Sequence, residues 1–215
     1  MENNIWGRSN IVWGMNEMST LSYSGTTIGV KVREGVVLSS DKNYIYGNYI
    51  FSGNVKKVFI INNWVGASAA GVAGDLQQLF NDISFLIRLQ EIRLGRRMNV
   101  RSVAKLASVM MYNRKLLPYL TQIIIGGYID RPEIYSLDSW GSIIDDKYIV
   151  LGTGAETAIG IIESNYDYNM ELNDAVKLVI DGFKASSSRD VLTGNNVDIL
   201  KIDRNGVKEE TLEIR

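Results

Sequence analysis

The sequence predicts a single α+β domain in which blocks of strands alternate with pairs of helices. Two observations support this: apolar residues alternate with polar ones in three separate stretches, and three-to-four spacing of apolar residues marks two intervening helix pairs. The resulting order, strands, two helices, strands, two helices, strands, is typical of a layered α+β domain. With 215 residues, 46% hydrophobic and 22% charged, the chain can form one domain with a substantial core.

The first strand block opens with a hairpin. Ile28, Val30 and Val32 alternate with polar residues, and residues 33–35 turn the chain back into the apolar residues 36–38. Further strands of this block are expected at residues 49–51, 58–61 and 64–70.

Two long helices are expected next, over residues 75–94 and 100–117. Asp75 suits the N-terminal end of the first helix and Gly95 its stop, whereas Pro118 ends the second. Neither is long enough to span a membrane, so we expect no membrane association.

The second half repeats the pattern and closes with a hairpin. Strands are expected at residues 122–128, 133–137, 141–145 and 148–151, helices at 156–164 and 173–185, and a final hairpin at 197–202 and 210–214.

Composition excludes several kinds of function. Lys plus Arg number 23 against 24 Asp plus Glu, so a net charge of −1 provides no field that would gather nucleic acid or an anionic membrane. The absence of cysteine excludes disulfides, thiolate catalysis and Cys-ligated zinc. The absence of histidine leaves hydroxyl, carboxylate, ammonium and backbone groups for any hydrolytic chemistry. We predict no cofactor and no metal site.

The first 25 residues differ from the rest of the chain. They are polar, interrupted by charge, and contain no apolar run long enough for a signal peptide or a membrane span. We therefore expect a cytoplasmic protein with a leader or propeptide at residues 1–25, either removed or laid over a folded surface, and a domain at residues 26–215. Trp6 and Trp13 give the leader a capacity to dock.

Three short segments place reactive or small residues where strands or helices end: residues 24–29, 40–42 and 152–155. Together they resemble the β-type subunits of the archaeal-type proteasome core particle. Mature chains of that family begin with Thr-Thr-Thr-(Val/Ile)-Gly, exposed by self-cleavage after a glycine, and residues 25–30 occupy that place. The resemblance covers residues 25–203, and it implies the site residues Thr26, Asp41, Lys57, Gly71, Thr153, Asp190 and Thr193.

The resemblance also implies a fold and an assembly. The fold is the four-layer αββα sandwich of N-terminal-nucleophile hydrolases, and the assembly is a set of stacked seven-membered rings, with β rings inside and α rings outside. The partners would be proteasome α subunits, other β subunits, a regulatory ATPase that acts through the α ring, and unfolded polypeptide as the substrate of a threonine endopeptidase.

The family chemistry suits a chain without histidine or cysteine. The hydroxyl of an N-terminal threonine attacks the peptide carbonyl while its own α-amine acts as base. By the family's roles, Lys57 would lower the proton affinity of that hydroxyl and Asp41 would hold Lys57. The remaining residues would organise the amine and water, namely Thr153, Asp190 and Thr193, or line the oxyanion hole through a backbone N–H, namely Gly71. The family usually has serine where Thr153 and Thr193 stand.

The departure from the family lies at the nucleophile. Counting in one register puts Gly25, rather than a threonine, at the family's first position. A three-residue hairpin loop would pair Val32 with Val36, place Asp41 opposite Thr27 and point Thr26 away from Asp41. A two-residue loop would pair Ile28 with Asp41 and put Thr26 on the Asp41 side, but it mixes polar and apolar residues on both faces, so the first register is preferred.

Three functions remain open from the sequence. The chain could cleave peptides through a processed Thr26, or it could be a non-catalytic structural β subunit that keeps its leader and supports an active β partner. It could also be a different N-terminal-nucleophile amidohydrolase that acts on a small amide. Separately, the aromatic residues Tyr44, Tyr46 and Tyr49 could cover a subunit interface.

Overall fold

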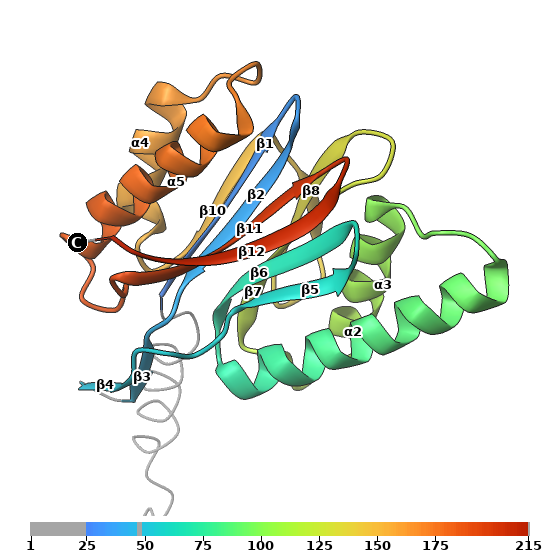
Figure 1. Cartoon of the computed structure of the whole chain (residues 1–215). Coiled ribbons are helices and arrows are strands. Elements are labelled where there is room, and N and C mark those ends of the chain that lie inside the picture. Colours follow the sequence, from blue (N-terminus) through green and yellow to red (C-terminus); the bar gives the residue numbers. More distant parts are fainter. Residues whose placement is uncertain (1–24, 47–48, 215) are drawn as a thin grey trace, which may run out of the picture.

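The computed structural model describes residues 25–46 and 49–214, and they form two five-stranded antiparallel sheets with helices on both outer sides (Figure 1). The first sheet has the order β10-β1-β2-β11-β12 and contains β1 (Thr26–Val32), β2 (Gly35–Asp41), β10 (Tyr148–Gly152), β11 (Asn196–Asp203) and β12 (Gly206–Glu213). The second has the order β5-β6-β7-β8-β9 and contains β5 (Val58–Asn62), β6 (Val65–Gly71), β7 (Thr121–Tyr128), β8 (Pro132–Leu137) and β9 (Ile143–Asp145).

Helices complete the four layers. The first sheet is covered by α4 (Ala155–Asn165) and α5 (Leu172–Ser187), and the second by α2 (Ala73–Leu94) and α3 (Val100–Asn113). The predicted αββα sandwich is therefore confirmed. Within the described residues, no helix combines the length and the apolar character that a membrane crossing requires.

Three apolar cores hold the layers together. One joins the first sheet to α4 and α5, one lies between the sheets, and one joins the second sheet to α2 and α3. The inner strands of each sheet are covered on both faces, so β2 and β6 are buried along their whole length. The site described below lies at one end of this doubly buried region.

The hairpin of β1 and β2 has the two-residue loop of the alternative that the sequence analysis did not prefer, although the pairing stated for that loop is wrong: Ile28 lies opposite Ser39, not Asp41. Its loop is the two residues between Val32 and Gly35, which pair with each other, and Thr27 lies opposite Ser40. The predicted pairing of Val32 with Val36 is therefore wrong, as is the placement of Asp41 opposite Thr27. Val36 belongs to the core between the sheets, whereas Val32 belongs to the core under the helices. Since both faces are buried, the apolar pattern could not choose between registers one residue apart.

The second long helix ends earlier than expected. It stops at Asn113 rather than residue 117, and the N–H of Arg114 donates to the carbonyls of Met111 and Tyr112. Leu116 and Leu117 are 95% and 78% exposed, so another helical turn would bury little apolar surface. Pro118 also disfavours helical backbone at the residue before it.

A two-stranded ribbon stands apart from the sandwich. It consists of β3 (Tyr44–Tyr46), which the sequence did not predict, and β4 (Tyr49–Ser52), which it did. Figure 1 shows the ribbon at the end of the sandwich where β1 begins. The other predicted elements are present with ends shifted by a few residues.

Candidate functional site

The site is built around a buried ion pair at the start of β1. Lys57 lies immediately before β5 of the second sheet, and its Nζ donates to Asp41 Oδ1 at 3.0 Å. Asp41 ends β2 of the first sheet, and the side chains of both residues are at most 1% exposed. The pair therefore bridges the two sheets.

Asp41 accepts four hydrogen bonds. Oδ1 receives the Thr26 N–H at 2.9 Å as well as Lys57 Nζ, and Oδ2 receives the N–H groups of Asn43 at 2.9 Å and Gly194 at 3.1 Å. A carboxylate has about four acceptor positions, so this one is saturated. It ties together the starts of β1, β3 and β5 and the loop after α5.

Gly25 directly faces this ion pair. A Cβ at residue 25 would lie 2.6 Å from Lys57 Nζ and closer still to Asp41 Oδ1, both well inside van der Waals contact. The φ angle of Gly25 is +92°, a conformation that residues with a side chain rarely adopt. The position facing Lys57 is thus occupied by a residue without a side chain.

Thr26 directs its hydroxyl to the other face of the strand. Thr26 Oγ1 lies 2.6 Å from Thr193 Oγ1, and Thr193 Oγ1 donates to Asp190 Oδ2 at 2.5 Å. Thr153 Oγ1 donates to the same carboxylate oxygen at 2.6 Å. This chain of three hydroxyls and one carboxylate lies on the helix side of the first sheet, because successive side chains of a strand point to opposite faces.

The next residue confirms the alternation. Thr27 Oγ1 donates to Ser68 Oγ of the second sheet at 2.7 Å, and thus points between the sheets. Gly25 shares that direction with Thr27, whereas Thr26 shares the opposite direction with Ile28, which packs under the helices.

Six of the seven predicted site residues fall into two groups. Asp41 and Lys57 form the ion pair; the other four residues, Thr26, Thr153, Asp190 and Thr193, form the hydroxyl network. The Gly25 carbonyl connects the groups, because it accepts hydrogen bonds from Thr153 N at 2.9 Å and Thr153 Oγ1 at 3.3 Å.

The seventh predicted residue, Gly71, belongs to the second sheet and lies beside this site. It is the last residue of β6, with a φ of +142°, and a Cβ there would clash with the backbone of Leu120 and Thr121. Its neighbour Ala70 contacts the site, since a Cβ on Gly152 would lie 3.0 Å from the Ala70 Cβ.

Sequence reasoning assigned no role to four residues that shape the site, although two of them lie in the segment 152–155 that it singled out. Asn43 and Gly194 donate backbone N–H groups to Asp41, and no pattern in the sequence marks them. Gly152 and Gly154 leave room for neighbours: a Cβ on Gly152 would meet the Gly25 carbonyl, and one on Gly154 would meet Thr26 Oγ1. The Gly-Thr-Gly motif at residues 152–154 was the available signal.

Comparison with known proteins identifies the family of the chain. The family model described as Proteasome subunit matches residues 22–202. The chain belongs to the proteasome subunit family. It is 42% identical to Proteasome subunit beta 1 of Cenarchaeum symbiosum (strain A). The 184 aligned residues cover 86% of this chain and 95% of the relative.

Other relatives also match along nearly their whole length. Proteasome subunit beta 2 of Pyrobaculum calidifontis (strain DSM 21063 / JCM 11548 / VA1) is 38% identical over 91% of this chain and 97% of the relative. Proteasome subunit beta 1 of Nitrosopumilus maritimus (strain SCM1) is 39% identical over 92% of this chain and 100% of the relative. The chain is therefore a β-type proteasome core component, which displaces the small-amide hydrolase as an interpretation.

Replacing Asp41 tests the structural role of the ion pair. We expect Asp41→Asn to lower the free energy of unfolding by about 3 kcal/mol or more, because Lys57 loses the charge that compensates its burial. The control is Asp145→Asn, which breaks the Lys31–Asp145 bridge, where Asp145 is 59% exposed; its cost should stay below about 1 kcal/mol. Urea denaturation of both variants measures the difference, and equal midpoints would contradict the role given to Asp41.

A pair of glycines tests the crowding at residue 25. We expect Gly25→Ala to destabilise the protein by at least about 1–2 kcal/mol, since its φ is positive and its Cβ would displace the ion pair. Gly74→Ala is the matched control: it lies in α2 with no atom within 4 Å of its Cβ position, and it should stabilise by up to about 1 kcal/mol. Thermal denaturation compares them, and a Gly25→Ala variant as stable as wild type would show that residue 25 has room for a side chain.

Proposed function

We propose that this chain is a non-catalytic β subunit of the inner proteasome ring, which retains its leader and supports an active β partner. The observation that supports this most directly is that Gly25 faces Lys57 and Asp41. In the family mechanism, the lysine acts on a hydroxyl of the first residue, and glycine has none to offer.

A shift of the strand would be needed to bring Thr26 to Lys57. Strand β1 is held on both sides, with Thr26 opposite Gly152 on β10 and Thr27 opposite Ser40 on β2. A one-residue slip would reverse every side chain of β1 between two buried faces, placing Thr27 under the helices and Ile28 between the sheets. The hydroxyl of Thr26 therefore stays with Thr193.

One observation favours the alternative, in which Thr26 becomes an N-terminal nucleophile. The carbonyl oxygen of Gly25 accepts two hydrogen bonds from Thr153, and the Thr26 hydroxyl is linked through Thr193 to the Asp190 carboxylate. In self-cleavage, Thr26 Oγ would attack the Gly25 carbonyl carbon, the peptide C–N bond would break to give an ester, and water would hydrolyse that ester. This would release residues 1–25 and leave Thr26 with a free amine.

The surroundings of the subunit follow from the family. The proteasome family implies assembly into rings with α subunits, and we propose stacked seven-membered rings that hold other β chains and degrade unfolded polypeptide delivered by a regulatory ATPase. We also propose a cytoplasmic location.

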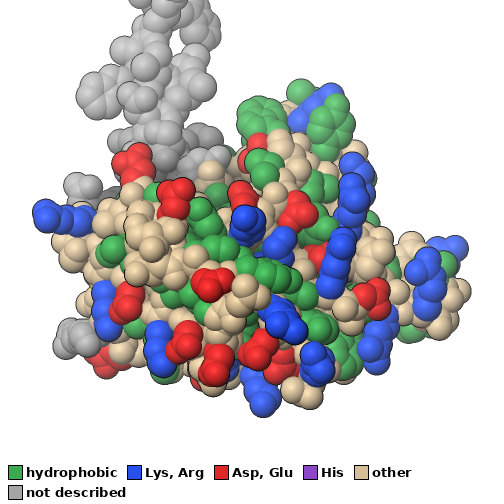
Figure 2. Space-filling view, turned by 90° about the horizontal axis from the view of Figure 1, so that it is seen from above, with side chains coloured by type: hydrophobic (Ala, Val, Ile, Leu, Met, Phe, Trp, Pro, Cys, Tyr) green, Lys and Arg blue, Asp and Glu red, His purple; other side chains and the backbone are tan. Residues whose placement is uncertain are grey.

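Residues 1–24 of the predicted leader lie outside the described residues, and the retention of the leader is part of this proposal. Figure 2 shows positive and negative side chains interspersed over one face, without a large region of a single sign.

The intact mass of the chain in assembled particles tests the proposal. Particles are assembled from α subunits, this chain and a β chain that begins with threonine after processing. We expect this chain to keep residues 1–25, and Thr26→Ala to leave both its mass and the peptidase activity per particle unchanged. Replacing the nucleophile of the other β chain is the control, and it should abolish activity.

The opposite result is equally defined. Wild-type chain lacking residues 1–25, retention of those residues in Thr26→Ala, and their removal in Thr26→Ser would identify Thr26 as a nucleophile. Peptidase activity of particles that contain only this β chain would lead to the same conclusion.

A further inference from the structure

The β3–β4 ribbon exposes apolar side chains that take no part in the candidate site. Four of its side chains, Tyr46, Tyr49, Ile50 and Phe51, are between 56% and 63% exposed. The described residues of the ribbon include no charged side chain. Tyr46, Tyr49 and Phe51 share one face, where the ring centroid of Tyr49 lies 6.2 Å from that of Tyr46 and 6.5 Å from that of Phe51, whereas Ile50 points to the opposite face. An exposed aromatic patch of this kind usually marks a binding site.

The ribbon has little support of its own. Its two strands pair with each other and with neither five-stranded sheet, and the pairing is irregular at Tyr44. Its ring contacts are internal, with Tyr44 and Phe51 edge to face at 5.8 Å and Tyr46 and Tyr49 at 6.2 Å. An isolated two-stranded hairpin is marginally stable in water, so a covering partner would stabilise it.

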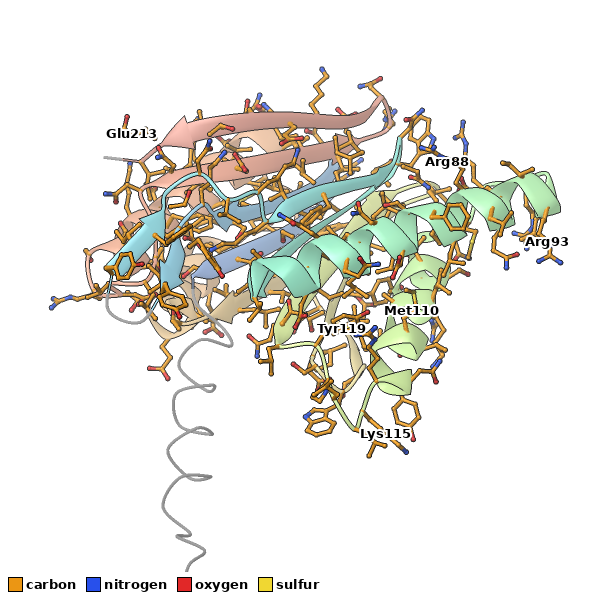
Figure 3. The ribbon with its side chains drawn as sticks, turned by 90° about the horizontal axis from the view of Figure 1, so that it is seen from below. Arg88, Arg93, Met110, Lys115, Tyr119 and Glu213 are labelled. Atoms are coloured by element: carbon orange, nitrogen blue, oxygen red, sulfur yellow. The ribbon has the colours of Figure 1, made fainter. Side chains whose placement is uncertain are left out.

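The ribbon begins where the leader joins the domain. Asp41 accepts the N–H of Thr26, the second described residue, and the N–H of Asn43, the residue before β3. The base of the ribbon is closed by the Val55 N–H, which donates to the Lys42 carbonyl. Figures 1 and 3 both place the ribbon at this end of the sandwich, away from the end of α2 that carries Arg93.

The leader has a composition that fits such a surface. Residues 1–24 contain three charged side chains, Glu2, Arg8 and Glu17, and several large apolar ones, among them Trp6, Ile11 and Trp13. Twenty-four residues can reach roughly 80 Å when extended, whereas a four-residue strand spans about 13 Å. A tethered segment also acts at an effective concentration on the order of millimolar.

We propose that the leader, residues 1–24, packs its tryptophans on the exposed face of the β3–β4 ribbon. This inference rests on the proposed function, because it requires a retained leader. The covered ribbon would then hold the leader across the start of β1, on the side of the domain where Gly25 meets the ion pair.

A second apolar patch makes a useful control. It lies at the end of α3, where Tyr112, Leu116, Leu117 and Trp140 are at least 55% exposed. The cations of Arg114 and Lys115 lie over the rings of Tyr119 and Tyr112. Figure 3 shows Lys115 well away from the β3–β4 ribbon.

Hydrogen exchange on the full-length chain tests the inference. The chain is first shown by intact mass to keep its leader and by sedimentation to be monomeric at the working concentration. We expect Trp6→Ser/Trp13→Ser to speed amide exchange in residues 44–46 and 49–52 by about ten-fold, because the cover is lost. The control, Leu116→Ser/Trp140→Ser, should leave exchange in the ribbon unchanged. Both leader substitutions lie outside the described residues, so they remove no contact that the structure describes.

A reciprocal variant gives an independent measurement. Phe51→Ser should increase acrylamide quenching of tryptophan fluorescence in the full-length chain but not in Trp6→Ser/Trp13→Ser. Unchanged ribbon exchange in the leader variant would overturn the inference while leaving the proposed function intact. Ribbon protection that rises with protein concentration would overturn it in favour of a second copy as the cover. A chain that has lost its leader would instead overturn the proposed function.

Discussion

The buried ion pair between Lys57 and Asp41 is the constraint on which the site depends. Two opposite charges removed from water are tolerated only when their remaining hydrogen-bonding groups are also satisfied. Asp41 meets this condition by accepting from Thr26, Asn43 and Gly194 as well as from Lys57. The backbone around it is therefore positioned by the need to satisfy one carboxylate.

That constraint explains why residue 25 is compatible only with glycine in this conformation. The Asp41 and Lys57 side chains come so close to Gly25 that a Cβ would overlap them, and its carbonyl is fixed on the opposite side by Thr153. In the family mechanism the aspartate and lysine serve catalysis, whereas here the same pair also positions the backbone around it. In the proposed non-catalytic subunit, the ion pair would keep this structural task alone.

Much of the fold could be predicted because local signals agree with the tertiary structure. Gly95 ends α2 in a left-handed conformation, as its position in the sequence indicates, and Asn99 caps α3 by accepting from the Ser102 N–H. The family resemblance also placed Asp41 beside Lys57, because such a resemblance transmits tertiary contacts that local patterns do not contain. That Thr26 would point away from Asp41 was also anticipated, although from a register that the structure does not have.

The parts that failed depend on tertiary contacts. The register of β1 and β2 could not be chosen from the apolar pattern, because Val36 finds an apolar environment between the sheets as readily as Val32 does under the helices. The two backbone donors to Asp41 besides Thr26, Asn43 and Gly194, come from positions whose side chains carry no signal for that role. The ribbon strand β3 was missed because three residues are too few for a recognisable alternation.

The most direct test of the central claim is a high-resolution map of the assembled particle at the start of β1. We predict continuous main-chain density through residues 24–26, with Gly25 against the ammonium of Lys57 and the Thr26 hydroxyl at Thr193. Density that begins at Thr26, with its hydroxyl moved within hydrogen-bonding distance of Lys57, would contradict the account.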